Sequence, residues 1–140
     1  MVNSSGPSTI GPLFNVPTYE TNLWGINAVA NNKKDVFILK KIRQKNKLLT
    51  YKKLVDLGFF NGVYLSSSII NQYRLKVVNN SAEEILGGLK EFIILQKKII
   101  KPSLQQILFK KILPNYIEYK HYSSNISQYF LKKNKRLFSL

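Results

Sequence analysis

The residues best suited to chemistry lie at the amino end of the chain, in the small polar turn formed by Asn3, Ser4, Ser5 and Gly6. Pro7 follows at the first position of an expected short helix, where its missing N–H costs nothing. The backbone N–H groups at a helix start and the hydroxyls of Ser4 and Ser5 would point their hydrogen-bond donors at the same position. Such an arrangement favours binding of a phosphate there. Gly6 allows close backbone approach to a ligand. The turn therefore predicts a diphosphate-binding site, with a simple helix cap as the alternative.

A second polar group, Glu20, Thr21 and Asn22, follows an apolar stretch that reads as a strand over residues 16–21. Ligands of α/β proteins bind at the carboxyl ends of strands. We therefore expect this group to lie beside the amino-terminal turn and to contact the sugar or ribose of a bound nucleotide. Ordinary turn chemistry explains Asn22 equally well, and a surface carboxylate at a strand end is the favoured interpretation of Glu20.

Three further features each allow two interpretations. Trp24 has the ring to stack on a base or a sugar, but a single tryptophan is more often partly buried core. The basic stretch at residues 33–53 either steers an anionic ligand or forms a solvated face. His121 suits a catalytic base, although a surface position near the last helix is favoured.

Composition excludes several classes of site. The 140 residues include no cysteine and one histidine, so disulfides and thiolate metal sites are absent. No Asp-x-Asp pair occurs, and a metal–diphosphate mechanism needs clustered carboxylates. We expect no metal and no cofactor. No apolar run reaches the roughly 18 residues of a membrane span, and no signal-peptide pattern opens the chain, so we expect a cytoplasmic protein.

The net charge of +15 is unevenly distributed. Residues 1–32 carry only Glu20, whereas residues 33–140 hold all 22 basic residues and six acids, a net of +16. Such a charge attracts nucleic acid, anionic membranes or phosphorylated ligands. It leaves open a small basic RNA-binding protein of ribosomal type, and a peripheral contact with the inner face of a bacterial membrane through the lysine-rich helices after residue 97. Lysine abundance is also typical of AT-rich genomes.

The elements that must position these residues follow from apolar spacing and caps. The expected elements are a helix at 7–14, strands at 16–21, 36–39 and 75–78, a basic loop at 40–47, and helices at 50–57, 66–73, 81–100, 104–112 and 124–134. Their order predicts an α/β fold with two or three strands, fewer than a complete doubly wound sheet contains.

The longest expected helix has two features that packing can test. Ser81 and Glu84 form a capping box at its start, and its buried stripe is expected to be Ile85, Leu86, Leu89, Phe92 and Ile93. Gly87 and Gly88 weaken the helix by about 1 kcal/mol each, so we expect a packing partner to lie close to them.

Seven segments, taken in order, resemble the C-terminal domain of a two-Rossmann-domain (GT-B type) glycosyltransferase, in a bacterial family tied to surface polysaccharide synthesis. They are NSSGP at 3–7, PLFNVP at 12–17, TN at 21–22, DVFI at 35–38, LTY at 49–51 followed by Leu54, NSAEEIL at 80–86 and ISQYFLKKN at 126–134. No single segment is specific, but their order and spacing cover nearly the whole chain. Leu39 departs from the pattern, which has a proline there.

The resemblance implies that residues 1–100 are part of a nucleotide-sugar (donor) domain and residues 101–140 a helical extension packed on it. It implies that Asn3, Ser4, Ser5 and Gly6 grip the donor diphosphate, without a metal. The strand before this turn, the rest of the donor domain and an N-terminal acceptor domain would precede Met1. The general base would lie in that part, so the catalytic residues are unknown and the isolated chain is expected to be inactive on its glycan or lipid acceptor.

Overall fold

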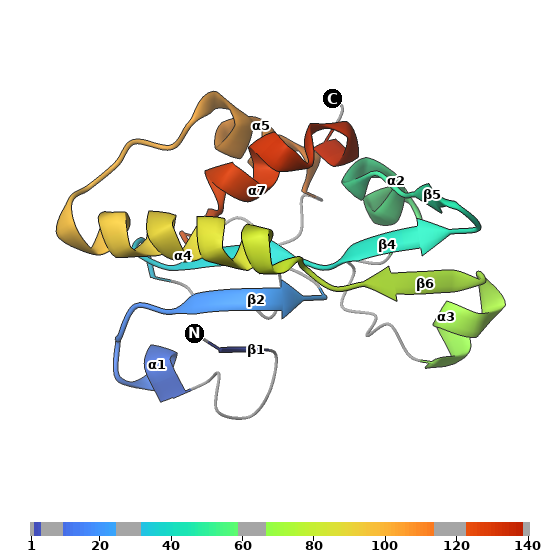
Figure 1. Cartoon of the computed structure of the whole chain (residues 1–140), viewed down its shortest axis with the longest axis horizontal. Helices are drawn as coiled ribbons and strands as arrows, with labels where there is room; N and C mark the ends of the chain where they lie inside the picture. Colours follow the sequence, from blue (N-terminus) through green and yellow to red (C-terminus); the bar gives the residue numbers. More distant parts are fainter. Residues whose placement is uncertain (1, 4–9, 25–31, 59–66, 114–122, 139–140) are drawn as a thin grey trace.

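The structure, a computed structural model, describes residues 2–3, 10–24, 32–58, 67–113 and 123–138 (Figure 1). It is a mixed α/β fold, as the sequence predicts, and is compatible with a partial Rossmann-like domain. Helix α4 (Ala82–Lys97) lies across the front of strands β2 (Tyr19–Leu23) and β3 (Val36–Leu39) (Figure 1). Strand β1 (Val2–Asn3) and helix α1 (Ile10–Leu13) lie on one side of α4, and helices α5 (Leu104–Ile112) and α7 (Gln128–Lys133) lie on the other.

The main sheet is parallel throughout. Its strand order is β1 (Val2–Asn3), β2 (Tyr19–Leu23), β3 (Val36–Leu39) and β7 (Asn125–Ile126). The expectation that no strand precedes the amino-terminal turn is wrong, because β1 runs directly into it and pairs with β2. The described sheet has four strands rather than two or three, since β1 and β7 span only two residues each, too short for periodicity to show.

A second sheet is antiparallel and has the order β5 (Lys47–Leu48), β4 (Lys41–Gln44) and β6 (Leu75–Val78). Helix α3 (Ser67–Gln72) precedes β6. The predicted basic loop at 40–47 is wrong, because the chain leaves β3 and continues through Lys40 into β4. The sequence hides this strand since Ile42 is its single buried residue, among Lys41, Arg43 and Gln44.

The helices expected at 50–57, 81–100 and 104–112 begin where the sequence predicts, but the helix expected at 124–134 begins later, at Gln128, because Asn125 and Ile126 form β7. Helix α2 (Tyr51–Asp56) is capped by Thr50, α4 by the Ser81–Glu84 capping box, α5 (Leu104–Ile112) by Ser103, and α7 (Gln128–Lys133) by Ser127. A 3₁₀ helix, η3 (Lys135–Phe138), follows α7. Gly58 ends α2 in the left-handed conformation, with φ of 79°.

Strand β3 is the centre of the core, and all four of its residues are buried. Successive side chains of a strand point to opposite faces. Tyr19 of β2 pairs in register with Val36 of β3, and its side chain faces α4. Its ring centroid lies 6.1 Å from the ring centroid of Phe92 in α4. Phe37 faces the other way, 6.5 Å from Phe109 of α5. The sheet is therefore covered on both faces, as its continuous apolar run requires.

The glycine pair in α4 is packed closely, which confirms that prediction. A Cβ on Gly88 would lie 2.9 Å from Cζ of Tyr19, and one on Gly87 would lie 2.5 Å from Cγ of Tyr129. The predicted stripe is wrong at Leu86 and Ile93, which are 51% and 47% exposed.

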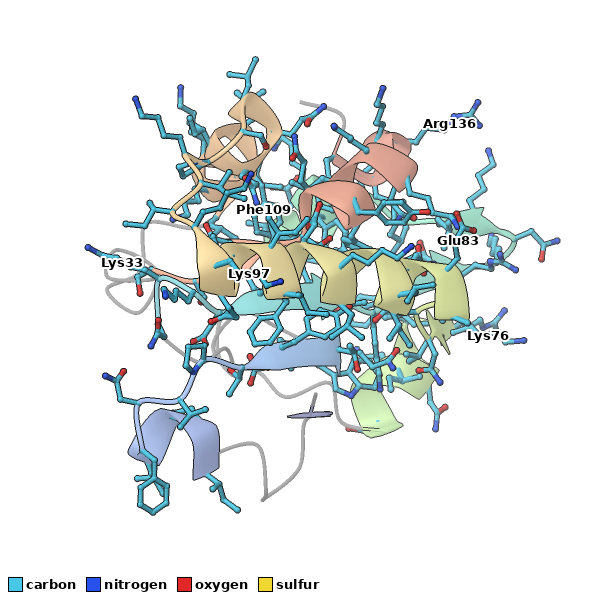
Figure 2. The ribbon with its side chains drawn as sticks, turned by 60° about the vertical axis from the view of Figure 1, so that its left-hand side comes forward. Lys33, Lys76, Glu83, Lys97, Phe109 and Arg136 are labelled. Atoms are coloured by element: carbon cyan, nitrogen blue, oxygen red, sulfur yellow. The ribbon has the colours of Figure 1, made fainter. Side chains whose placement is uncertain are left out.

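The side chains at the two ends of α4 differ in their surroundings. Figure 2 shows Lys33 and Lys97 toward one end of this helix and Lys76 and Glu83 toward the other.

No helix within the described ranges is long and apolar enough to cross a lipid bilayer.

Candidate functional site

The carboxyl ends of β1, β2 and β3 meet at one edge of the parallel sheet. Strand pairing sets Val2 opposite Glu20 and Asn3 opposite Thr21. Neighbouring strands lie about 4.8 Å apart, so the two polar groups singled out in the sequence begin side by side. Ser4, Ser5 and Gly6 lie outside the described residues, and their role stays a prediction.

The second polar group lies within β2 rather than after it, because the strand continues to Leu23. Glu20 and Thr21 are buried, with 2% and 4% of their surface exposed. The interpretation of Glu20 as a surface carboxylate is therefore wrong, and the residue has an interaction partner within the chain. The contact of Glu20 and Thr21 with a donor stays a prediction.

Asn22 and Asn80 hold each other in place at this edge. The Asn22 backbone N–H donates to Oδ1 of Asn80 at 2.8 Å, and the Asn80 backbone N–H donates to Oδ1 of Asn22 at 2.7 Å. The Asn80 amide also donates to the Leu39 carbonyl at 2.8 Å. Asn22 has a φ of 55°, a left-handed conformation that asparagine tolerates better than most residues. The pair ties the ends of β2 and β3 to the start of α4.

Trp24 and Lys40 lie next to this pair. The Lys40 ammonium is 4.3 Å from the centroid of the Trp24 ring, a cation–π distance. The Lys40 backbone N–H donates to the Leu23 carbonyl at 2.8 Å, and its carbonyl accepts from the Tyr51 hydroxyl at 2.9 Å. Partial burial lowers the pKa of Lys40. We call Asn22, Trp24, Lys40 and Asn80 the carboxyl-edge cluster; it presents a ring, a cation and amides on one edge.

A buried ion pair supports the cluster from behind. The Lys41 ammonium donates to both carboxylate oxygens of Glu84, at 2.7 and 2.8 Å, and the Glu84 side chain is 1% exposed. The Ser81 backbone N–H and the Asn134 amide add hydrogen bonds of 2.7 and 2.8 Å. Burial acts to raise the pKa of Glu84, but hydrogen bonds led by the one from Lys41 outweigh it and leave the pKa lowered. One carboxylate thus joins β4, the start of α4 and the end of α7.

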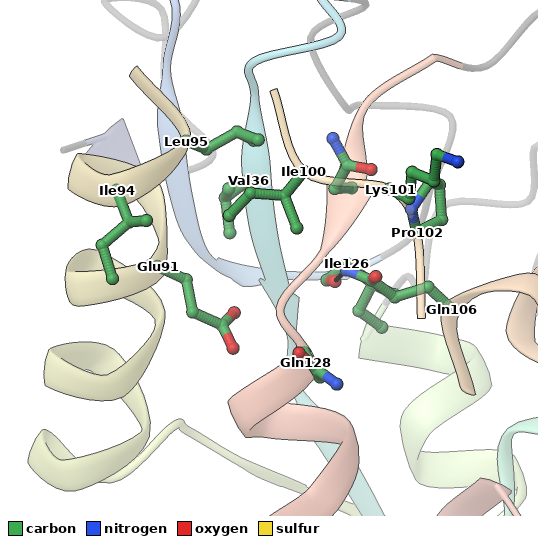
Figure 3. A pocket seen from close by; sticks show the side chains of 11 residues that line it. Val36, Glu91, Ile94, Leu95, Ile100, Lys101, Pro102, Gln106, Ile126 and Gln128 are labelled. Atoms are coloured by element: carbon green, nitrogen blue, oxygen red, sulfur yellow. Dashed lines mark hydrogen bonds between the residues drawn. The ribbon is translucent and has the colours of Figure 1, made fainter. Parts of the chain in front are cut away.

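A pocket of about 200 Å³ lies toward the opposite edge of the sheet. It is bounded by α4, the start of α5 and β7, and includes Val36 and Glu91 (Figure 3). Figure 3 shows the Glu91 side chain extending from α4 toward Gln128 at the start of α7. Burial raises the pKa of Glu91, although hydrogen bonds from Ser127 and from the Tyr129 N–H oppose the shift. Glu91 therefore caps α7, and this pocket holds none of the predicted site residues.

Metal-ligating side chains do not gather in the part of the chain that the structure describes, where no three of His, Asp or Glu meet. Metal-independent chemistry stays a prediction. His121 lies outside the described ranges.

Sequence reasoning missed Lys40 and Asn80. Lys40 immediately follows the buried run of residues 36–39, so its place at a strand end was readable from the pattern. Asn80 stands directly before the Ser81 capping box, but nothing in the sequence links it to Asn22, 58 residues earlier.

Comparison with curated proteins finds similarity to a subunit of ATP synthase. The chain is 33% identical, over 96 residues, to the ATP synthase gamma chain of Clostridium perfringens, in strains SM101, ATCC 13124 and 13. The matched stretch is 69% of this chain but only 30% of the gamma chain, so the chain spans less than a third of the relatives it matches. No protein-family model matches the sequence, and no solved structure matches the fold.

Proposed function

We propose that this chain is the C-terminal, donor-binding portion of a glycosyltransferase of the GT-B type. The complete enzyme would transfer a sugar from a nucleotide-sugar to a glycan or lipid acceptor in surface polysaccharide synthesis. The observation that carries the proposal is the pairing of Asn3 with Thr21 on adjacent parallel strands. Asn3, the first residue of the predicted turn, therefore lies beside the second polar group, and α/β proteins bind nucleotides at this kind of sheet edge.

The carboxyl-edge cluster adds chemistry that suits a nucleotide diphosphate. In this proposal Ser4, Ser5 and Gly6 bind the diphosphate, and the Lys40 ammonium offsets its charge. The Trp24 ring, which already carries this cation at 4.3 Å, stacks on the base or the sugar. Asn22 is a positioning residue, because its Oδ1 is committed to the Asn80 N–H.

The acceptor and the group that deprotonates it belong, in this proposal, to a part of the enzyme outside residues 1–140. Binding of the donor diphosphate and turnover are therefore separable. The chain alone should bind nucleoside diphosphates and should not hydrolyse or transfer a sugar, which is checked by product analysis with a panel of nucleotide-sugars. Turnover by residues 1–140 would contradict this division of roles.

The test is calorimetric titration of residues 1–140 with UDP, GDP, CDP and ADP, and with the matching monophosphates. We expect one diphosphate to bind and its monophosphate to bind more weakly. Ser4→Ala/Ser5→Ala should weaken the diphosphate at least about tenfold, since a hydrogen bond to a charged group is worth about 1.5–3 kcal/mol. Lys40→Gln should weaken it too.

The matched control is Ser67→Ala/Ser68→Ala in α3, a helix outside the carboxyl-edge cluster. This variant should bind like the parent chain. Equal binding of diphosphate and monophosphate, or equal loss in both double variants, would overturn the assignment of the turn.

The net charge of +15 favours a second candidate, a small basic RNA-binding protein. That function predicts RNA binding whose logarithmic affinity falls steeply with the logarithm of salt concentration. A flat dependence, or no binding at low salt, would remove it. The gamma-chain similarity carries no proposal, because it spans 30% of that protein's length.

A further inference from the structure

An apolar ridge protrudes where α4 ends and α5 begins. Ile99 is 93% exposed, Ile100 is 48% exposed and Leu104 is 70% exposed. The sequence pattern favours a buried role for the apolar residues of α5, yet of that helix only Phe109 is buried. Isolated exposed apolar side chains need no explanation, but three within six residues form a patch, and such patches mark interaction sites.

Lysines surround these side chains. Lys97, Lys98 and Lys101 are exposed, and residues 97–113 contain five lysines and no Asp or Glu. We call Ile99, Ile100 and Leu104 with these three lysines the lysine-rimmed ridge.

A second segment brings more positive charge to the same end of α4. The Lys34 ammonium donates to the Gln96 carbonyl at 3.2 Å, and the Gln96 amide donates to the Lys34 carbonyl at 3.0 Å. The open pocket between these segments, of about 700 Å³, is lined by Lys33 and Lys34 as well as Ile99 and Ile100. Figure 2 shows Lys33 and Lys97 on this side of the molecule.

We propose that the lysine-rimmed ridge docks on an anionic phospholipid bilayer. Exposed isoleucine and leucine side chains enter the interfacial region of a bilayer, and the surrounding lysines bind the anionic headgroups. A second copy of the chain fits the ridge poorly, because it would bring another +15 of net charge to a positive surface. RNA would use the lysines but leave Ile99 and Leu104 without a role.

The ridge is independent of the proposed donor site. Helix α4 begins beside the carboxyl-edge cluster and ends at the ridge, and its 16 residues span about 24 Å. Membrane docking therefore leaves the carboxyl edge accessible, and failure of either proposal does not decide the other.

The experiment is co-sedimentation of residues 1–140 with vesicles of 30% phosphatidylglycerol in phosphatidylcholine, and with pure phosphatidylcholine vesicles. We expect binding to the anionic vesicles alone, and its loss in 1 M NaCl, where the Debye length is about 3 Å. Lys97→Gln/Lys98→Gln/Lys101→Gln should weaken binding about 100-fold, at roughly fivefold per lysine. Ile99→Ser/Leu104→Ser should weaken it at least about tenfold.

Matched controls come from the opposite end of the molecule. Lys45→Gln/Lys47→Gln/Lys76→Gln removes the same charge from the second sheet, and Leu48→Ser/Leu86→Ser removes two exposed apolar side chains. Both controls should bind anionic vesicles like the parent chain. The proposal is overturned if each control weakens binding as much as its ridge counterpart, if phosphatidylcholine vesicles bind equally, or if no vesicle binds.

A second readout reports on the ridge directly. The chain has no cysteine, so Leu104→Cys carries a single environment-sensitive label. Its emission should shift to the blue with anionic vesicles, while the same label at Leu48→Cys should not respond. Two other results would contradict the proposal. One is a lysine effect on vesicle binding without an Ile99/Leu104 effect, which points to an electrostatic contact alone. The other is vesicle-free self-association lost in Ile99→Ser/Leu104→Ser, which points to a second copy.

Discussion

The buried carboxylate of Glu84 offers the sharpest test of how the carboxyl edge is held. Replacing it by glutamine, Glu84→Gln, keeps the size of the side chain but removes its charge. The Lys41 ammonium, whose side chain is 12% exposed, then loses the partner it contacts at 2.7 Å. One amide oxygen must also replace two carboxylate oxygens that accept from the Ser81 N–H and from Asn134.

Removing one member of a buried ion pair costs about 3–5 kcal/mol, because the remaining charge is left uncompensated. For a chain of this length that corresponds to a fall in Tm of roughly 10–20 °C. The exposed pair Lys52–Asp56 is the matched control, since its side chains are 64% and 52% exposed and its contact is 3.4 Å. Asp56→Asn should cost less than about 0.5 kcal/mol.

The assay is urea unfolding of the parent chain, of Glu84→Gln, of Asp56→Asn and of the double variant Lys41→Met/Glu84→Gln. The double variant no longer buries an unpaired charge, so it should recover at least about 1 kcal/mol relative to Glu84→Gln. A loss below about 1 kcal/mol in Glu84→Gln, or no recovery in the double variant, would refute the assignment of Glu84 as a charge-dependent clamp.

The pH dependence follows from the lowered pKa of Glu84. The folded state holds the carboxylate ionised more strongly than the unfolded chain, whose value is near 4.5. The stability from Glu84 is therefore present above pH 4.5 and is lost as the pH falls through the lower folded-state pKa. Unfolding midpoints measured from pH 7 to pH 3 should fall in the parent chain and should depend less on pH in Glu84→Gln.

Three more outcomes are expected from the same unfolding assay and from NMR. Gly88→Ala gains about 1 kcal/mol of helix propensity but crowds the buried Tyr19, so the free energy of unfolding should fall by about 1–3 kcal/mol net. Gly87→Ala should cost less, because the half-exposed Tyr129 can move outward, and a stabilised Gly88→Ala would contradict this packing. Asn80→Ala should lower the free energy of unfolding by about 2–4 kcal/mol, because it leaves buried backbone groups unpaired. Asn79→Ala, at the exposed neighbouring position, should have little effect, and equal losses in the two variants would contradict the role of the asparagine pair. The carboxyl carbon of Asp35 should titrate above its ordinary range, because burial raises its pKa; a midpoint at or below 3.8 would contradict that environment.

Much of the fold follows from local signals in the sequence. The caps at Thr50 and Ser81 each begin a helix where predicted, because cap chemistry acts within four residues. The run at 36–39 is a buried strand, since four apolar residues in succession need two covered faces. The two-residue strands β1 and β7 carry no such signal and exist only through pairing with neighbours distant in sequence.

The site was less predictable because its geometry depends on pairing over long distances. The chemistry of Thr21 and Asn22 suggested a strand end, but the last residue of β2 is set by Leu39 of the next strand. Asn80 reaches Asn22 only after the chain has passed through the whole second sheet. The exposed ridge was hidden for a different reason: periodicity identifies an apolar face of α5 but cannot tell whether anything covers it.

The second sheet and the carboxyl-edge cluster share the same two chain crossings. The chain leaves the parallel sheet through Lys40 into β4 and returns from β6 through Asn80 into α4. Both crossings are fixed to the parallel sheet, by the bond from the Lys40 N–H to Leu23 and by the bond from the Asn80 amide to Leu39. Any rotation of the β4–β6 arm must therefore displace the Lys40 ammonium or break the asparagine pair. A ligand at this edge that contacts Lys40 would hold the second sheet in one orientation relative to the parallel sheet. The Lys41–Glu84 ion pair, one residue beyond Lys40, already holds that orientation in the protein without ligand.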